Sequence, residues 1–204
     1  MKKTVLIVSL FLLAGMSFGQ TVLFEEPFDA KLKDGWMWIN ESPDNWKIVD
    51  GGLEIRMEPF DGPKAKNILV RDVPDRSQGT LIFEVKLTSK QTPKKQYQQA
   101  GLFWMRNENF ALKFVKELID GQLYVFPGKI PMEAVSVHLK WTVKGDEVVS
   151  EFKPEGEEKY QQAFVGKIPP LEEKEKDQIS LQCWHGLEDE PHWVRFESFK
   201  ILRE

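Results

Sequence analysis

Apolar and polar residues alternate along several short stretches of this chain. Between residues 135 and 143 the odd-numbered positions hold Val, Val, Leu, Trp and Val, and the even-numbered ones hold Ser, His, Lys and Thr. A period of two is typical of a β-strand with one buried face, and the same test predicts strands at Leu53–Met57 and Leu81–Leu87. Short apolar runs between turn residues predict the other strands, which are Ala100–Met105, Phe110–Lys116, Gln122–Phe126, Val148–Phe152, Ile179–Trp184 and Trp193–Leu202.

Turn-forming residues separate these runs, as at Asp50-Gly51-Gly52 and Asp120-Gly121. Only Leu171–Gln178, rich in Glu and Lys, indicates a helical turn, and no repeating βαβ unit is found. The predicted fold class is therefore all-β. Roughly ten short alternating strands favour two antiparallel sheets stacked as a sandwich or jelly roll, because stacking covers one face of each sheet.

The first residues have the pattern of an export signal. Lys2 and Lys3 precede an apolar stretch over residues 4–13, and Ser17-Phe18-Gly19 is a small-residue cleavage pattern. We therefore expect a signal peptide over residues 1–19, a single domain over residues 20–204, and a secreted or periplasmic location. The apolar stretch is shorter than the ~20 residues of a spanning helix, so no membrane insertion is expected after cleavage.

Charge and cysteine content exclude several classes of function. The chain has 28 basic and 32 acidic residues and no basic tract, which argues against nucleic acid as a partner. Cys183 is the only cysteine, so an internal disulfide is impossible, and its apolar strand predicts an inert buried thiol. Since no glycine-rich phosphate loop precedes a helix, no nucleotide cofactor is indicated.

Aromatic residues are the candidates for ligand contact. Seven Trp and fourteen Phe accompany three Tyr, and such rings either fill a core or offer flat apolar faces to a ligand. Sugar recognition combines aromatic faces with polar groups for the hydroxyls, and the alternative for each Trp is core packing. The candidate ligand-binding residues are Gln99, Trp104, Lys113, His138 and Trp184.

The order of several motifs resembles a known superfamily. They include Gly35-Trp36, the stretch 46–55, the stretch 99–104 and the closing stretch 194–201. This order resembles concanavalin A-like lectin/glucanase domains, and among these it is most similar to bacterial domains related to the regulation-of-enolase protein. The resemblance implies a jelly-roll sandwich of two curved antiparallel sheets whose concave face contacts glycan. It also implies a structural calcium ion held by Asp29 and Glu197, the only cofactor expected.

Three functions follow from these observations as alternatives. The first is a non-catalytic, lectin-like module that binds glycan or polysaccharide. The second is a carbohydrate-active hydrolase using Glu117, Glu188 or Glu190, although the alternating Glu, Asp and Glu of laminarinase-type relatives is missing. The third is an interaction protein with an apolar concave face. Two His and three acids in residues 184–193 raise metal binding as a further alternative to a polar loop.

Overall fold

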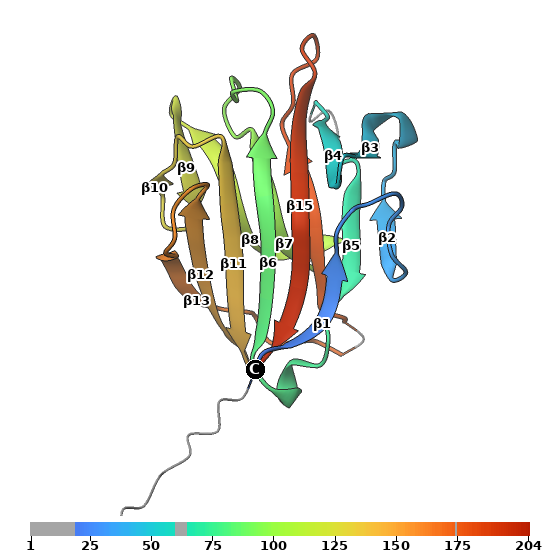
Figure 1. Ribbon diagram of the computed structural model, residues 1–204, viewed down its shortest axis with the longest axis vertical. Coiled ribbons are helices and arrows are strands. Elements are labelled where there is room, and N and C mark those ends of the chain that lie inside the picture. The colour runs from blue at the N-terminus through green and yellow to red at the C-terminus, as the bar shows by residue number, and fades with distance from the viewer. Residues whose placement is uncertain (1–18, 60–64, 174) are drawn as a thin grey trace, which may run out of the picture.

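Two antiparallel β-sheets stack face to face in the computed structural model, which describes residues 19–59, 65–173 and 175–204 (Figure 1). The predicted signal peptide lies outside the described residues except for Gly19. The sandwich confirms the predicted all-β fold class. Within the described ranges the helical elements are two short 3-10 turns, η1 (Pro43–Asn45) and η2 (Arg76–Gln78), and no helix is long and apolar enough to cross a membrane.

The first sheet has eight strands and faces the viewer in Figure 1. Its central strand β15 pairs with β6 along one edge, while β4 and β1 share the other edge. Because Thr21 pairs with Arg203, the start of β1 lies beside the C-terminus. Its strands in spatial order are β13 (Gln161–Lys167), β12 (Glu147–Pro154), β11 (Ser136–Lys144), β6 (Leu81–Ser89), β15 (His192–Arg203), β4 (Gly52–Met57) and β3 (Trp46–Val49), with β1 (Thr21–Glu26) on β15.

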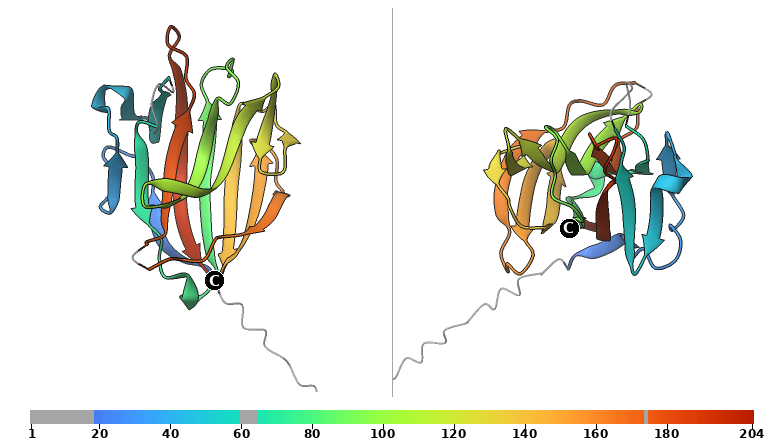
Figure 2. Two further views of the ribbon diagram at one scale, coloured as in Figure 1. Left: turned by 180° about the vertical axis from the view of Figure 1, so that it is seen from behind. Right: turned by 90° about the horizontal axis from the view of Figure 1, so that it is seen from above.

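The second sheet has seven strands and lies behind the first; Figure 2 (left) views the molecule from its side. Its spatial order is β10 (Ile130–Pro131), β9 (Gln122–Phe126), β8 (Asn109–Ile119), β7 (Gln99–Arg106), β14 (Gln178–Trp184), β5 (Ile68–Asp72) and β2 (Trp36–Ile39). All nine predicted strands are present. The described residues of Leu171–Gln178, where a helical turn was predicted, contain no helix; Glu173 lies in a turn in which the Glu175 amide donates to the Glu172 carbonyl at 3.1 Å, and Gln178 begins β14.

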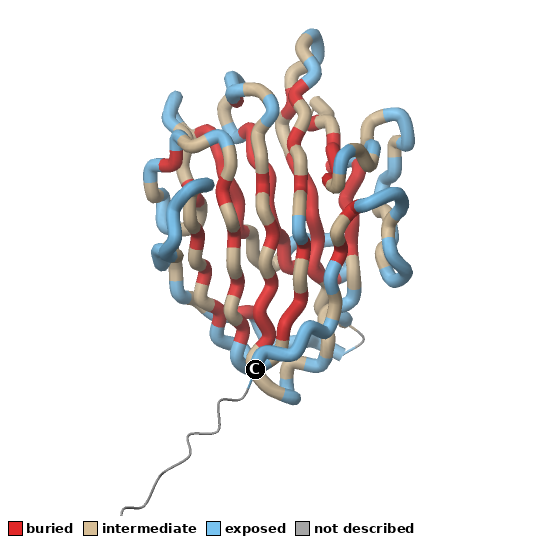
Figure 3. The backbone as a smooth tube through the Cα atoms, in the orientation of Figure 1, coloured by how far each residue is buried: buried red, intermediate tan, exposed pale blue. Residues whose placement is uncertain are grey.

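Alternation explains where the core lies. On β6 and β11 every odd-numbered residue except Ser89 is buried, and most of the even-numbered ones are partly exposed, as in a half-buried strand (Figure 3). The inward-facing residues of both sheets form one hydrophobic cluster that includes Phe83, Trp104 and Trp141. The sequence missed β1, β2, β3, β5, β10 and β13, most of which are edge strands or strands of four or five residues.

Candidate functional site

The outer face of the seven-stranded sheet is hollowed. Phe103, Met105 and Val115 alternate with core residues and so point away from the other sheet, yet they are buried in a second apolar cluster. Ser180 and Gln182, also outward-facing, are fully buried. Side chains of the same face, among them Phe126 and Trp184, pack against the apolar members, and hollows lie among these side chains. We call this outer, hollowed face the concave face.

Two hollows on this face meet at Trp184. One, of about 450 Å³, lies at the first residue of β7 and is lined in part by Gln99, Lys113, Glu117 and Trp184. The other, of about 200 Å³, lies near the last residues of β7 and is lined by residues that include Met105, Phe110 and again Trp184. A larger hollow of about 540 Å³ lies beside η2, but its described lining contains no aromatic side chain. The pair of hollows at Trp184 is therefore the candidate site.

Three polar side chains in the 450 Å³ hollow form a closed hydrogen-bonded set. Gln99 lies opposite Glu117 in the β7–β8 ladder, and Lys113 lies four residues before Glu117 on the same face of β8. The Lys113 Nζ donates to Gln99 Oε1 and to Glu117 Oε2, both at 2.9 Å, and Gln99 Nε2 donates to Glu117 Oε1 at 3.1 Å. Because each group holds the others, the set presents fixed polar atoms to a ligand.

A chain of hydrogen bonds along β14 positions the Trp184 ring. Trp184 Nε1 donates to Gln182 Oε1 at 2.7 Å, and Gln182 Nε2 donates to Ser180 Oγ at 2.8 Å. The ring also lies nearly parallel to that of Phe103, with 6.1 Å between centroids and an interplanar angle of 7°. These contacts fix the orientation of an aromatic face before any ligand arrives.

The turn after Trp184 depends on a glycine. His185 has a φ of 66°, and the Gly186 amide donates to the Glu58 carbonyl at 3.0 Å. A Cβ atom at Gly186 would overlap the Met57 carbonyl, so the backbones of the two segments can approach this closely only with glycine.

We expect Gly186→Ala to lower the free energy of unfolding by about 1–3 kcal/mol, because the added methyl group must push two backbone segments apart. Chemical denaturation measures the change. Glu188→Ala, an exposed position in the same loop, serves as the control with an expected change within about 0.5 kcal/mol. Equal unfolding midpoints for the two variants would contradict the role assigned to Gly186.

The structure brings together three of the five residues proposed from sequence as ligand contacts. Gln99, Lys113 and Trp184 all line the 450 Å³ hollow. Trp104 lies in the core with 0% of its surface exposed, so the expectation that its ring stacks on a ligand is corrected. It faces inward because it alternates with Phe103, which takes the outer position on β7.

His138 lies on the opposite side of the molecule. It points outward from β11 in the eight-stranded sheet, where its Nε2 lies 2.9 Å from Glu155 Oε2. That outer face is covered by ion pairs such as Lys140–Glu151 at 2.8 Å. His138 therefore cannot join the set around Trp184, and its inclusion in one site is also corrected.

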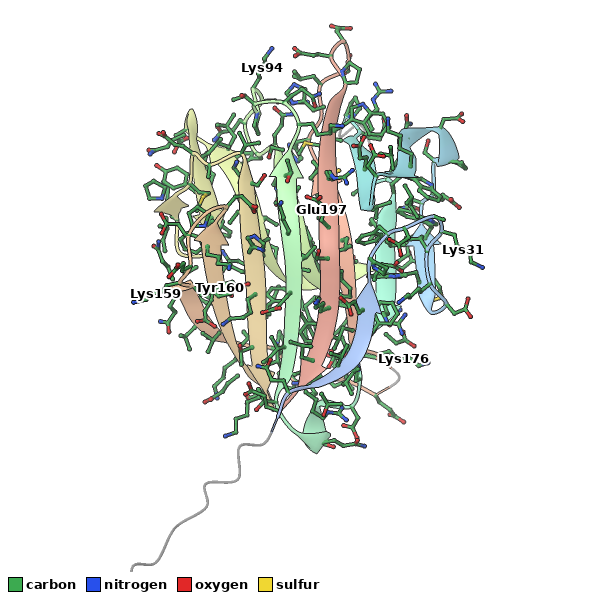
Figure 4. The ribbon with its side chains drawn as sticks, in the orientation of Figure 1. Lys31, Lys94, Lys159, Tyr160, Lys176 and Glu197 are labelled. Atoms are coloured by element: carbon green, nitrogen blue, oxygen red, sulfur yellow. The ribbon has the colours of Figure 1, made fainter. Side chains whose placement is uncertain are left out.

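The calcium positions implied by the resemblance receive no support from side-chain arrangement. Glu197 lies on the outer face of β15 (Figure 4), where Arg195 and Lys86 approach its carboxylate at 3.2 and 3.7 Å. Asp29 is exposed in the loop after β1. Two cations already neutralise Glu197, whereas calcium requires about six to eight oxygen ligands. These residues do not fit a calcium site, and calcium stays an untested prediction.

The histidines of residues 184–193 point to different places. His192 is buried, and its Nδ1 lies 2.9 Å from Gln98 Nε2, whereas His185 lines the 450 Å³ hollow. No group of three or more His, Cys, Asp or Glu side chains suited to a metal ion occurs among residues that the structure describes.

Sequence reasoning did not assign a binding role to several members of the concave face. The residues not proposed include Phe103, Phe110, Tyr97 and Phe126. Phe103 nevertheless lies an even number of residues from Gln99 on β7, and so on the same face of the strand. Every residue of β7 is buried, because one face meets the core and the other meets the hollowed surface. The apolar sequence of β7 therefore does not indicate which of its aromatic rings faces outward.

Comparison with solved structures supports the fold assignment. The chain is similar to the GH43 protein BlXynB from Bacillus licheniformis, at a TM-score of 0.73 and 18% identity over 88% of this chain and 39% of that one. It is also similar to a xylan beta-1,4-xylosidase from Bacillus halodurans, at a TM-score of 0.65 and 18% identity over the same shares. The chain shares their β-sandwich fold.

A third structure covers a similar share of this chain and the full length of its own. It comes from work on endo-acting O-glycanases of human gut bacteria, with a TM-score of 0.56 and 14% identity over 90% of this chain and 100% of that one. The chain spans about two fifths of the length of the BlXynB and xylosidase structures. No protein-family model and no curated protein matches the sequence.

Proposed function

We propose that this protein is a non-catalytic carbohydrate-binding module that contacts glycan through the concave face of its seven-stranded sheet. The observation that carries the proposal is the fixed Trp184 ring beside the closed Gln99–Lys113–Glu117 set. An aromatic face suits the apolar side of a sugar ring, and amide, ammonium and carboxylate groups suit its hydroxyls. The similar structures described as xylosidase and O-glycanase act on glycans, which agrees with this ligand class.

Hydrolysis is the less supported alternative. Retaining and inverting glycosidases both use two carboxyl groups, about 5 Å or 6.5–9.5 Å apart. The described linings of the two hollows hold one carboxylate each, Glu117 and Glu108, and Lys113 and Gln99 bind both oxygens of Glu117. Glu188, another acid considered from sequence, is exposed in the loop after β14. These features favour binding without bond cleavage.

The proposal includes export and the closer family likeness. The leader pattern over residues 1–19 is consistent with a secreted or periplasmic protein that meets extracellular polysaccharide. The similarity of the motifs to bacterial domains related to the regulation-of-enolase protein remains part of the same proposal.

We expect Trp184→Ala to weaken glycan binding more than about tenfold, since a central aromatic anchor contributes about 2 kcal/mol or more to a binding site. Affinity electrophoresis of the protein through gels containing xylan, laminarin, galactomannan, mucin glycans, alginate or polygalacturonate measures the effect. Circular dichroism checks that the variant keeps its β-sheet spectrum.

Trp193→Ala is the matched control. Trp193 lies on the outer face of the eight-stranded sheet, where Lys47 Nζ is 4.9 Å from its ring centroid. We expect this variant to retain full binding. Retardation of the parent protein by none of the glycans, or equal retardation of both Trp variants, would contradict the proposed function.

A further inference from the structure

Five aromatic side chains follow one another across the concave face. This aromatic row consists of Tyr97, His185, Trp184, Phe103 and Phe110. Successive ring centroids lie 6.2, 6.5, 6.1 and 5.7 Å apart, and Phe110 also contacts Trp184 edge to face at 5.7 Å. Phe103 is buried against Trp184, and the other four rings follow one another at 6.2, 6.5 and 5.7 Å. A pyranose ring is about the size of one six-membered aromatic ring, so a single sugar cannot cover all four.

The two ends of the aromatic row are its most exposed members. Tyr97 is 49% exposed and Phe110 is 45% exposed, whereas Phe103 between them is buried. Tyr97 lines the 450 Å³ hollow and Phe110 lines the 200 Å³ hollow, and Trp184 borders both. Large exposed aromatic rings at the rims of two adjoining hollows suit a ligand that crosses Trp184 and continues at both ends.

Charges beside the row are present in pairs. Lys113 lies 2.9 Å from Glu117, and Lys129 lies 3.9 Å from Asp120. Burial, together with the charge of Lys95, lowers the pKa of His185 and so disfavours its cationic form. Glu108 adds a carboxylate to the lining of the 200 Å³ hollow. Lys113 and Lys129 each lie near a carboxylate, and the described lining of the 200 Å³ hollow contains no lysine or arginine. Neither hollow therefore offers the excess of cationic side chains that an acidic polymer favours, and this supports an uncharged ligand.

We propose that the aromatic row binds the interior of a linear, uncharged polysaccharide, with consecutive sugar units seated on both sides of Trp184. This inference rests on the proposed function and adds the length and charge class of the ligand.

The test uses titration calorimetry of the full chain with oligosaccharides of two to six units from the neutral polysaccharide that binds it best among xylan, laminarin and galactomannan. We expect affinity to rise at least about tenfold from two units to six and to change less than about twofold between 50 and 500 mM salt. Tyr97→Ala and Phe110→Ala, at the two ends of the row, should each reduce that rise, and the double variant should remove most of it, while disaccharide affinity stays nearly unchanged. Trp193→Ala should behave as the parent protein.

The outcomes separate this inference from the proposed function. Full affinity with the disaccharide, or binding confined to alginate or polygalacturonate and lost at high salt, would overturn the inference and leave glycan binding standing. If affinity still rose with oligosaccharide length in both end variants, the inference would also be overturned, because the additional sugar units would then not bind to the aromatic row. Binding to no glycan at all would remove the proposed function and the inference together.

Discussion

Trp104→Ala is expected to lower the free energy of unfolding by about 3–5 kcal/mol, the usual range for truncating a buried aromatic residue. The Trp104 ring contacts Phe83 edge to face at 5.8 Å and lies 6.3 Å from the Trp141 ring, so its removal opens a cavity between the two sheets. Urea denaturation followed by circular dichroism measures the loss.

Part of this effect comes from a polar network at the edge of the core. Asp177 accepts hydrogen bonds from Trp104 Nε1 at 2.8 Å, Arg106 Nε at 2.7 Å and Arg76 Nε at 2.9 Å. Trp104→Phe keeps a six-membered aromatic ring in the core and removes the indole donor together with the five-membered part of the ring. Since the two arginines still neutralise Asp177, we expect this variant to lose about 1–2 kcal/mol.

Trp184→Ala provides the contrast, because Trp184 is partly exposed and its loss opens no cavity between the sheets. We expect it to cost less than half of the Trp104→Ala loss while removing glycan binding. If Trp104→Ala proved as stable as Trp184→Ala, the assignment of one ring to the core and the other to the concave face would be wrong.

Protein stability is expected to rise by about 2 kcal/mol between pH 7 and pH 9.5 because of Lys116. Lys116 is 4% exposed, and its ammonium donates to the Ala134 carbonyl. Burial lowers its pKa from 10.5 to about 8. Between these two values the unfolded chain binds more protons than the folded protein, so the free energy of unfolding increases with pH; below pH 8 the cost of burying the charge is nearly constant.

Lys116→Met isolates this contribution from other titrating groups. The neutral side chain is expected to remove the pH-dependent rise and to stabilise the protein at pH 7 by about 1–2 kcal/mol. The reason is that the free energy needed to bury the ammonium charge exceeds the stabilisation from its hydrogen bond to the Ala134 carbonyl. Denaturation midpoints of both proteins at pH 7, 8, 9 and 9.5 test this, and the range stops below the titration of most lysines and tyrosines. Parallel curves for the two proteins would contradict the prediction.

Local pattern was sufficient to predict much of the fold. The alternation in residues 81–87 and 135–143 identified β6 and β11, and the apolar odd-numbered residues that β6 and β11 contribute to these stretches are buried. The nine strands found in this way include the central strands of both sheets. Edge strands such as β2 and β13 were missed, because exposure on an open edge relaxes the demand for strict alternation.

The candidate site was predicted only in part. Residue chemistry selected Gln99, Lys113 and Trp184 correctly as members of one surface, and it also selected Trp104 and His138, which lie in the core and on the other sheet. Glu117 was considered as an acid, but its pairing with Lys113 was not foreseen. The sequence lists side chains that suit a sugar without saying which of them share a face.

By itself the sequence determined the all-β class and nine of the strands, because a period of two depends only on neighbouring residues along one strand. Only the tertiary structure decided which sheet is concave and which rings lie on it. On β7 both faces are buried, so the difference between Trp104 and Phe103 appears only when β14 and β8 pair beside β7 and the eight-stranded sheet covers one side. Pairing between strands far apart in the chain sets that choice, and no local pattern encodes it.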